Sequence, residues 1–149
     1  MDAVSYPNAA VANFINSQLI PLRVRSDHAL AGQFAIKWTP SLLLLDSGGQ
    51  EHSRTVGFLG AEELIPSLLL GQAKVFFNYD RHPEALRCLN SICSEYEQSM
   101  ATPEALFLRG VNLYKHTKNP TPLKEAYETL LAKFPNSEWT KRAAPYRLL

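Results

Sequence analysis

The clearest hydrophobic pattern of the chain lies between residues 38 and 56. Four consecutive leucines, Leu42 to Leu45, follow Thr39-Pro40 and precede the turn-forming residues 47–49, which are Ser, Gly and Gly. An apolar run without a polar face predicts a strand that is covered on both sides. Glycines adopt the positive φ angles of a tight turn without steric cost, so we expect a hairpin there. Residues 52–56 are expected to form its return strand, with one face partly exposed.

On either side of this hairpin the pattern alternates between helix and strand. Residues 8–18 carry apolar side chains at helical spacing and begin with Asn8, a residue type that commonly caps helices. Residues 19–24 are expected to form another strand, and a helix capped by Ser26 or Asp27 is expected to follow. A long helix is predicted for residues 61–79. Pro66 lies near its first turns, where proline bends a helix or marks a later start.

From about residue 71 the pattern predicts helices only, at residues 71–79, 82–98, 103–117, 122–134 and 137–148. A weak internal repeat runs through this part, with offsets of 37 and 41 residues for the first and second helices of each pair. The extra length falls in the loop at residues 119–122. Either two degenerate helical hairpins or a bundle without a repeat explains the pattern. The repeated positions are Ala73, Phe76, Ala85, Leu89 and Ile92, matched by Gly110, Leu113, Ala126, Leu130 and Lys133.

Composition narrows the class of protein. The chain has 149 residues, of which 46% are hydrophobic and 19% charged, as in one ordinary globular domain or two small ones. A net charge of +1 offers no broad field for nucleic acid. No apolar run is long enough to span a membrane, and residues 1 and 2 do not begin a signal peptide. We therefore expect a cytoplasmic protein.

The residue types that carry chemistry form no catalytic or metal motif. Cys88 and Cys93 stand five residues apart on one predicted helix, which separates their Cα atoms by about 7.5 Å along the axis and prevents a disulfide. We expect both to be small core residues. The four histidines share no metal-ligand spacing, and no glycine sequence matches a phosphate loop. The chain is expected to contain no catalytic residue, no metal site and no cofactor.

The first half of the chain resembles the thioredoxin superfamily. The resemblance covers about 70 residues and implies an α/β fold, in which residues 1–70 form a partial thioredoxin-like domain. It also implies a cis-proline at Pro40 and a polypeptide-binding site at Trp38, Thr39 and Pro40, where backbone hydrogen bonds hold an extended segment. Alternatively, Pro40 only shapes the fold. The residues that carry the resemblance are Thr39-Pro40, Leu42 to Leu45, Asp46, Gly48-Gly49 and Gly57, with Tyr6-Pro7-Asn8 and the apolar positions that follow them.

The chain departs from that family at its start. The family's CxxC and a central strand would lie just upstream of Met1, and no cysteine occurs before Cys88. Without that strand, residues 19–24 and 42–45 would leave backbone groups unpaired, which is costly when they are buried. Three resolutions stay open: the chain is a fragment, a neighbouring molecule supplies a strand, or the two strands pair directly. We expect the isolated chain to be either a homodimer or poorly stable.

The second half resembles tetratricopeptide repeats, which have a period of about 34 residues and small residues where paired helices touch. This implies an all-α helical-hairpin module at residues 71–149. The two resemblances predict a redox-inactive protein that binds polypeptides in a co-chaperone-like role, with no nucleic-acid or membrane partner. Alternatively, the chain is the C-terminal part of a thiol-disulfide oxidoreductase in redox homeostasis, whose CxxC lies upstream of Met1. A third hypothesis is a scaffold whose sheet only anchors the helices.

Overall fold

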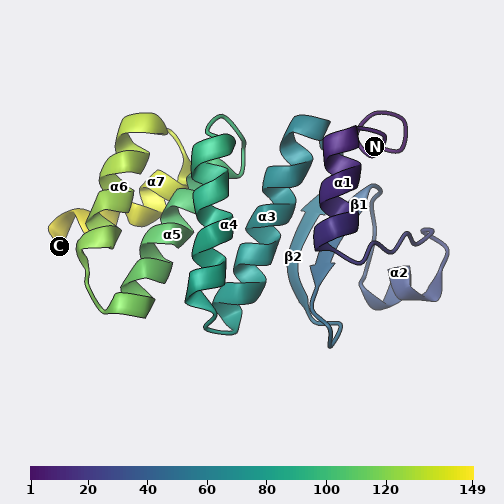
Figure 1. Ribbon diagram of the computed structural model, residues 1–149, viewed down its shortest axis with the longest axis horizontal. Helices are drawn as coiled ribbons and strands as arrows, with labels where there is room; N and C mark the ends of the chain where they lie inside the picture. Colours follow the sequence, from purple (N-terminus) through teal and green to yellow (C-terminus); the bar gives the residue numbers. More distant parts are fainter. The chain divides into compact units, whose positions relative to one another are not determined.

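The structure, a computed structural model, describes all 149 residues. The chain divides into two compact units, Met1–Ile65 and Pro66–Leu149, and the boundary lies inside helix α3 (Ala61–Asn78). The first unit contains a two-stranded antiparallel sheet with short helices, and the remainder of the chain is helical (Figure 1). At this coarse level the predicted order, an α/β part followed by an all-α part, is confirmed.

The first unit is built on four short elements, α1 (Ala9–Gln18), α2 (Ala29–Gln33), β1 (Ser41–Leu45) and β2 (Glu51–Val56). Asn8 caps α1 as predicted, because its side-chain oxygen accepts hydrogen bonds from the backbone N–H groups of Ala10 and Val11. β1 and β2 pair antiparallel, from Ser41 opposite Val56 to Leu44 opposite Ser53. The register shifts between Leu44 and Leu45, next to the turn.

The predicted strand at residues 19–24 does not form. These residues are irregular, and the sheet consists of β1 and β2 alone. Ile20 is 98% exposed and Leu22 is 75% exposed. A strand needs a neighbour for its N–H and C=O groups, and this segment has none, so its apolar side chains stay in water. Direct pairing of residues 19–24 with the leucine strand, one of the three resolutions considered, therefore does not occur.

The predicted caps of the second helix are also wrong. His28 caps α2, because its Nδ1 accepts the N–H of Leu30 at 3.1 Å. Asp27 is engaged elsewhere, since its two carboxylate oxygens accept from the Arg25 guanidinium at 3.1 and 2.9 Å. The cap therefore lies one or two residues later in the chain than predicted.

The second unit consists of consecutive helices that follow the predicted segments closely. They are α4 (His82–Glu95), α5 (Thr102–Thr117), α6 (Thr121–Lys133) and α7 (Glu138–Ala143), followed by a 3₁₀ helix at Ala144–Leu148. Each of α4, α5, α6 and α7 packs against the next helix in the chain, which gives the antiparallel arrangement visible in Figure 1. Pro83 and Pro103 stand at the first positions of their helices, where a missing N–H costs nothing.

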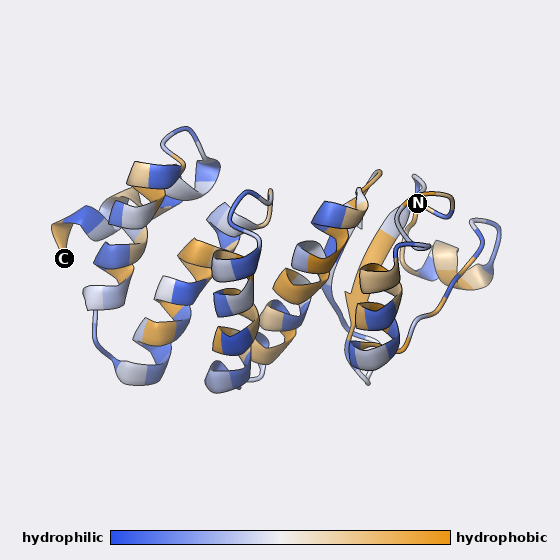
Figure 2. Ribbon diagram, turned by 45° about the horizontal axis from the view of Figure 1, so that its top comes forward, coloured by the Kyte–Doolittle hydropathy of each residue, from blue (hydrophilic) through white to orange (hydrophobic).

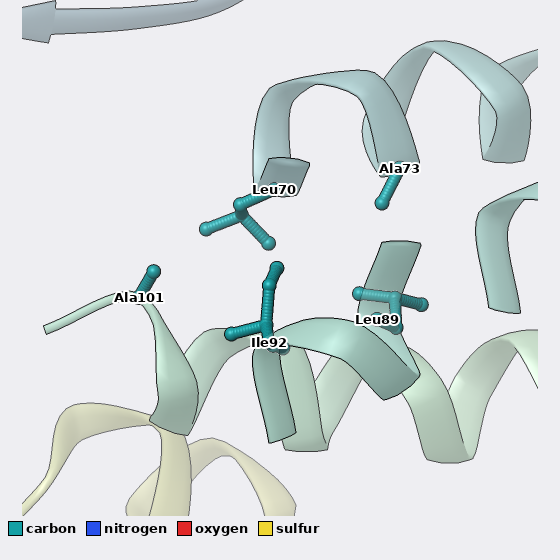
Figure 3. Packing of buried hydrophobic residues seen from close by; sticks show 6 residues of the cluster. Leu70, Ala73, Leu89, Ile92 and Ala101 are labelled. Carbon is teal, nitrogen blue, oxygen red and sulfur yellow. The ribbon is translucent and has the colours of Figure 1, made fainter. Parts of the chain in front are cut away.

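Interdigitated leucine, isoleucine and alanine side chains hold these helices together. Leu70 and Ala73 of α3 point toward Leu89 and Ile92 of α4, and Ala101 lies beside them (Figure 3). Leu89 and Ile92 are fully buried. A second cluster joins the next helices and consists of Leu106, Leu130 and Ala143.

Gly110 marks the closest approach between α5 and α6. A Cβ atom placed there would lie 2.6 Å from the Cβ of Ala126 and 2.8 Å from the carbonyl oxygen of Pro122. Gly110 and Ala126 are therefore the small residues at which paired helices touch, as their positions in the weak repeat predict. Lys133 stands at the position of the repeat that the buried Ile92 occupies in α4, but Lys133 is exposed. The repeat between α4 and α6 therefore does not extend to this position.

Candidate functional site

The outer edge of β1, the edge that faces away from β2, carries backbone groups without a strand partner. The N–H of Gly57 donates to the carbonyl of Pro40 at 2.8 Å. Hydrogen-bonded pairs alternate along an antiparallel ladder, so Leu42 with Thr55 and Leu44 with Ser53 are the next bonded pairs. The N–H and C=O groups of Ser41 and Leu43 must then point to the outer edge, where no further strand lies.

The two edges of the sheet differ in chemistry. β1 is Ser-Leu-Leu-Leu-Leu and has no charged residue, which Figure 2 shows as a continuous orange strand. On β2, Arg54 donates to both carboxylate oxygens of Glu51 at 2.7 and 2.6 Å, and this hydrogen bonding lowers the pKa of Glu51. Charged side chains discourage further pairing at an edge. The outer edge of β1 is consequently the more favourable of the two for an added strand.

Trp38, Thr39 and Pro40, the three predicted site residues, stand directly before this edge. The Thr39–Pro40 peptide bond is cis, and the Ser41 hydroxyl donates to the carbonyl of Trp38 at 2.6 Å, which joins the segment to the start of β1. The Trp38 side chain is 70% exposed. Trp38 and Thr39 line a cavity of about 330 Å³ together with Ser26, Ile36 and Lys37, whereas Pro40 is not among its lining residues.

Asp46 and His52 form a buried pair that the sequence analysis did not single out. His52 Nε2 donates to Asp46 Oδ2 at 2.8 Å, with the two side chains 1% and 8% exposed. The other carboxylate oxygen accepts the N–H groups of Gly48 and Gln50 at 2.8 and 3.0 Å. The pair fixes the hairpin turn, and its role is to hold β1 and β2 in register. The sequence did contain one indication of this pair: Asp46 stands two residues before Gly48-Gly49, where an aspartate commonly accepts hydrogen bonds from the N–H groups of a turn.

Cys88 and Cys93 are partly buried free thiols on α4. Both pack against the apolar cluster of α3 and α4, at the margin of the core in which they were expected. Burial raises the pKa of each thiol. Because the thiolate is the nucleophile, this environment opposes attack on a substrate disulfide.

A polar cluster in the second unit ties the start of α4 to α5. Asn112 is fully buried and donates from Nδ2 to the carbonyl of His82 at 3.0 Å, while its Oδ1 accepts from His82 Nδ1 at 2.6 Å. The His116 ring lies 5.6 Å from that of His82. No group of three His, Cys, Asp or Glu side chains is placed to hold a metal ion. The two hydrogen bonds between Asn112 and His82 link α5 to the start of α4.

No helix combines the length and apolar composition that crossing a bilayer requires. Comparison with family models, with curated proteins and with solved structures found no match to this chain.

Proposed function

We propose that the chain binds extended polypeptides by strand addition to the outer edge of β1, in an accessory or co-chaperone-like role. The observation that carries the proposal is the direction of the backbone groups of Ser41 and Leu43, which point away from β2. An extended segment satisfies such groups without demanding a particular sequence, because its main chain supplies the hydrogen bonds. Trp38, Thr39 and Pro40 stand where such a segment would pass the start of the strand.

We propose further that Met1–Ile65 is a partial thioredoxin-like domain and that the helices after it are tetratricopeptide-like. The order of a short helix, α2, followed by the antiparallel β1–β2 hairpin and then helix α3 supports the first assignment. The close contact of Gly110 with Ala126 between consecutive helices supports the second. Helical repeats present extended surfaces to peptides, so the second unit would add to the binding function rather than supply chemistry.

Hydrogen exchange combined with one proline substitution tests strand addition directly. The probe is a fluorescently labelled, unfolded polypeptide whose cysteines are carboxymethylated. The Leu43 N–H exchanges rapidly in the free chain and gains protection when the polypeptide is added. Leu43→Pro removes this donor without touching the β1–β2 ladder and weakens binding about tenfold, measured by fluorescence anisotropy. Leu43→Ala is the matched control, because it shortens the same side chain and keeps the N–H.

Two results would contradict the proposal. If Leu43→Pro and Leu43→Ala weaken binding equally, the side chain matters and the edge hydrogen bonds do not. If Leu43 gains protection as the protein concentration rises without added polypeptide, and sedimentation shows a dimer, a second copy of the chain occupies the edge.

A further inference from the structure

The cavity beside the start of β1 is lined by Ser26, Ile36, Lys37, Trp38 and Thr39. Four of these residues have side chains that can donate hydrogen bonds: the Lys37 ammonium, the Trp38 indole N–H and the hydroxyls of Ser26 and Thr39. The polar groups of these side chains have no hydrogen-bond partner elsewhere in the chain. Ammonium and indole N–H groups cannot accept, so the matching ligand group is an acceptor.

Lys37 differs from the other cations of the first unit. Arg23 pairs with Asp2 at 2.8 Å, Arg25 with Asp27 at 2.9 Å, and Arg54 with Glu51 at 2.6 Å. Lys37 has no carboxylate partner, and it is the cation that lines the cavity. The charge of this cavity is therefore uncompensated within the chain, and it complements a negatively charged group.

We infer that this cavity takes the side-chain carboxylate of an Asp or Glu in the polypeptide bound along β1; the inference rests on the proposed function. A volume of about 330 Å³ is at the small end of ligand sites and suits one or two side chains. The Trp38 ring and Ile36 contact the methylene groups of that side chain, and Lys37 binds its carboxylate. A side-chain carboxylate is favoured over a chain end because the strand continues past the cavity to pair with Ser41 and Leu43.

Matched peptides test the inference. The probes are acetylated, amidated ten-residue peptides of alternating Ser and Val, with one Glu placed at successive positions, and an equivalent set with Gln. At one position we expect the Glu peptide to bind about threefold to tenfold more tightly, the range for a partly exposed charged contact. Lys37→Gln removes this preference, so that Glu and Gln peptides bind that variant equally, whereas Lys37→Arg keeps the preference. Raising the salt concentration from 0.05 to 0.5 M reduces it.

Each alternative outcome overturns a different statement. If Glu and Gln peptides bind equally at every position and Leu43→Pro weakens both, strand addition stands and the carboxylate cavity is wrong. If only peptides with a free C-terminal carboxylate show the preference, the cavity binds a chain end and the assignment to Asp or Glu is wrong. If no peptide binds and Leu43 gains no protection, the proposed function fails and the inference fails with it.

Discussion

The two units of the chain differ in how many of their hydrophobic residues they bury. Met1–Ile65 supplies four of the buried apolar residues, and Pro66–Leu149 supplies thirteen. Both units expose some large apolar side chains, but the shorter first unit exposes more of them, among them Ile20, Leu22, Trp38 and Phe58. Helices satisfy their own backbone groups, whereas a two-stranded sheet leaves an edge open on each strand. The second unit therefore has the means to be stable by itself, and the first has surface left over for binding.

Equivalent leucine truncations in the two units should give the largest difference. Leu89→Ala removes a fully buried side chain from the α3–α4 cluster, and we expect it to lower the free energy of unfolding by about 2–5 kcal/mol. Leu44→Ala truncates a half-buried side chain on β1 and should cost about 1 kcal/mol. Guanidinium titration followed by far-UV circular dichroism measures both. Equal losses would contradict the view that the buried core lies mainly in the second unit.

A glycine-to-alanine pair should change stability in opposite directions. Gly110→Ala places a Cβ 2.6 Å from that of Ala126 and is expected to cost about 1–3 kcal/mol, because the backbone of α6 must move. Gly32 lies inside α2 with nothing within 4 Å of its added Cβ, so Gly32→Ala should be neutral or stabilise by up to about 1 kcal/mol. The midpoint temperatures of thermal unfolding of the two variants measure these changes in stability. An unchanged midpoint for Gly110→Ala would show that α5 and α6 are not closely packed at this position.

The second unit was the more predictable of the two from sequence, for a physical reason. Its helices follow from local patterns: apolar side chains at helical spacing, prolines at first-turn positions, and small residues such as Gly110 and Ala126 at contacts. The strand at residues 19–24 had a correct local pattern and still failed, since a strand needs a partner that the local sequence does not specify. Whether residues 19–24 form a strand thus depends on their neighbours in the folded structure and not on their own sequence.

The residues of the candidate site were also only partly predictable, because local sequence does not show which distant residues come together. Trp38, Thr39 and Pro40 could be singled out because a resemblance pointed to them, but nothing local joined Lys37 and Ser26 to the same cavity. The Asp46–His52 pair was missed because its members lie on different sides of the turn and approach only once the hairpin forms.

Asp46→Ala should destabilise the first unit alone. The substitution removes the acceptor of the Gly48 and Gln50 N–H groups and the partner of His52, at an expected cost of about 1–2 kcal/mol. Hydrogen exchange at β1 and β2 should accelerate while exchange in α4 to α6 stays unchanged. Ser47→Ala, at the exposed neighbouring position, is the control. Faster exchange in both units would mean that they unfold as one.

Thiol labelling reports on the second unit, because both cysteines lie on α4. Burial raises the pKa of Cys88 and Cys93, so less thiolate is present at pH 8 than in an unfolded chain. We expect alkylation at least tenfold slower than for the denatured protein. The stability from burying the neutral thiols is present below the unfolded pKa of 9.0 and is lost as pH rises through the folded values. Labelling as fast as in denaturant would show that α4 opens readily.

Removing the Glu51–Arg54 ion pair on β2 should have a small effect on the free energy of unfolding. Glu51→Gln removes an ion pair while Arg54 still donates to the carbonyl of Phe34 at 2.7 Å, so we expect a loss below about 1 kcal/mol. The Arg54 hydrogen bond lowers the pKa of Glu51. Its contribution is therefore present above the unfolded value near 4.5 and is lost as pH falls through the folded value. NMR titration of the Glu51 side chain measures the shift.

Arg81 and Glu84 form the matching i,i+3 pair at the start of α4, where hydrogen bonding to Arg81 also lowers the pKa of the Glu84 carboxylate. Glu84→Gln should leave exchange in the second unit unchanged, since the α4 backbone and the core beneath it do not depend on that pair. Glu51→Gln should accelerate exchange at β2, because it weakens the contact that holds the Arg54 guanidinium in place, and that guanidinium also joins the strand to Phe34 after α2. If Glu51→Gln and Glu84→Gln change hydrogen exchange equally little, surface ion pairs stabilise the sheet no more than they stabilise the helices. The two units would then differ only in how many apolar residues they bury.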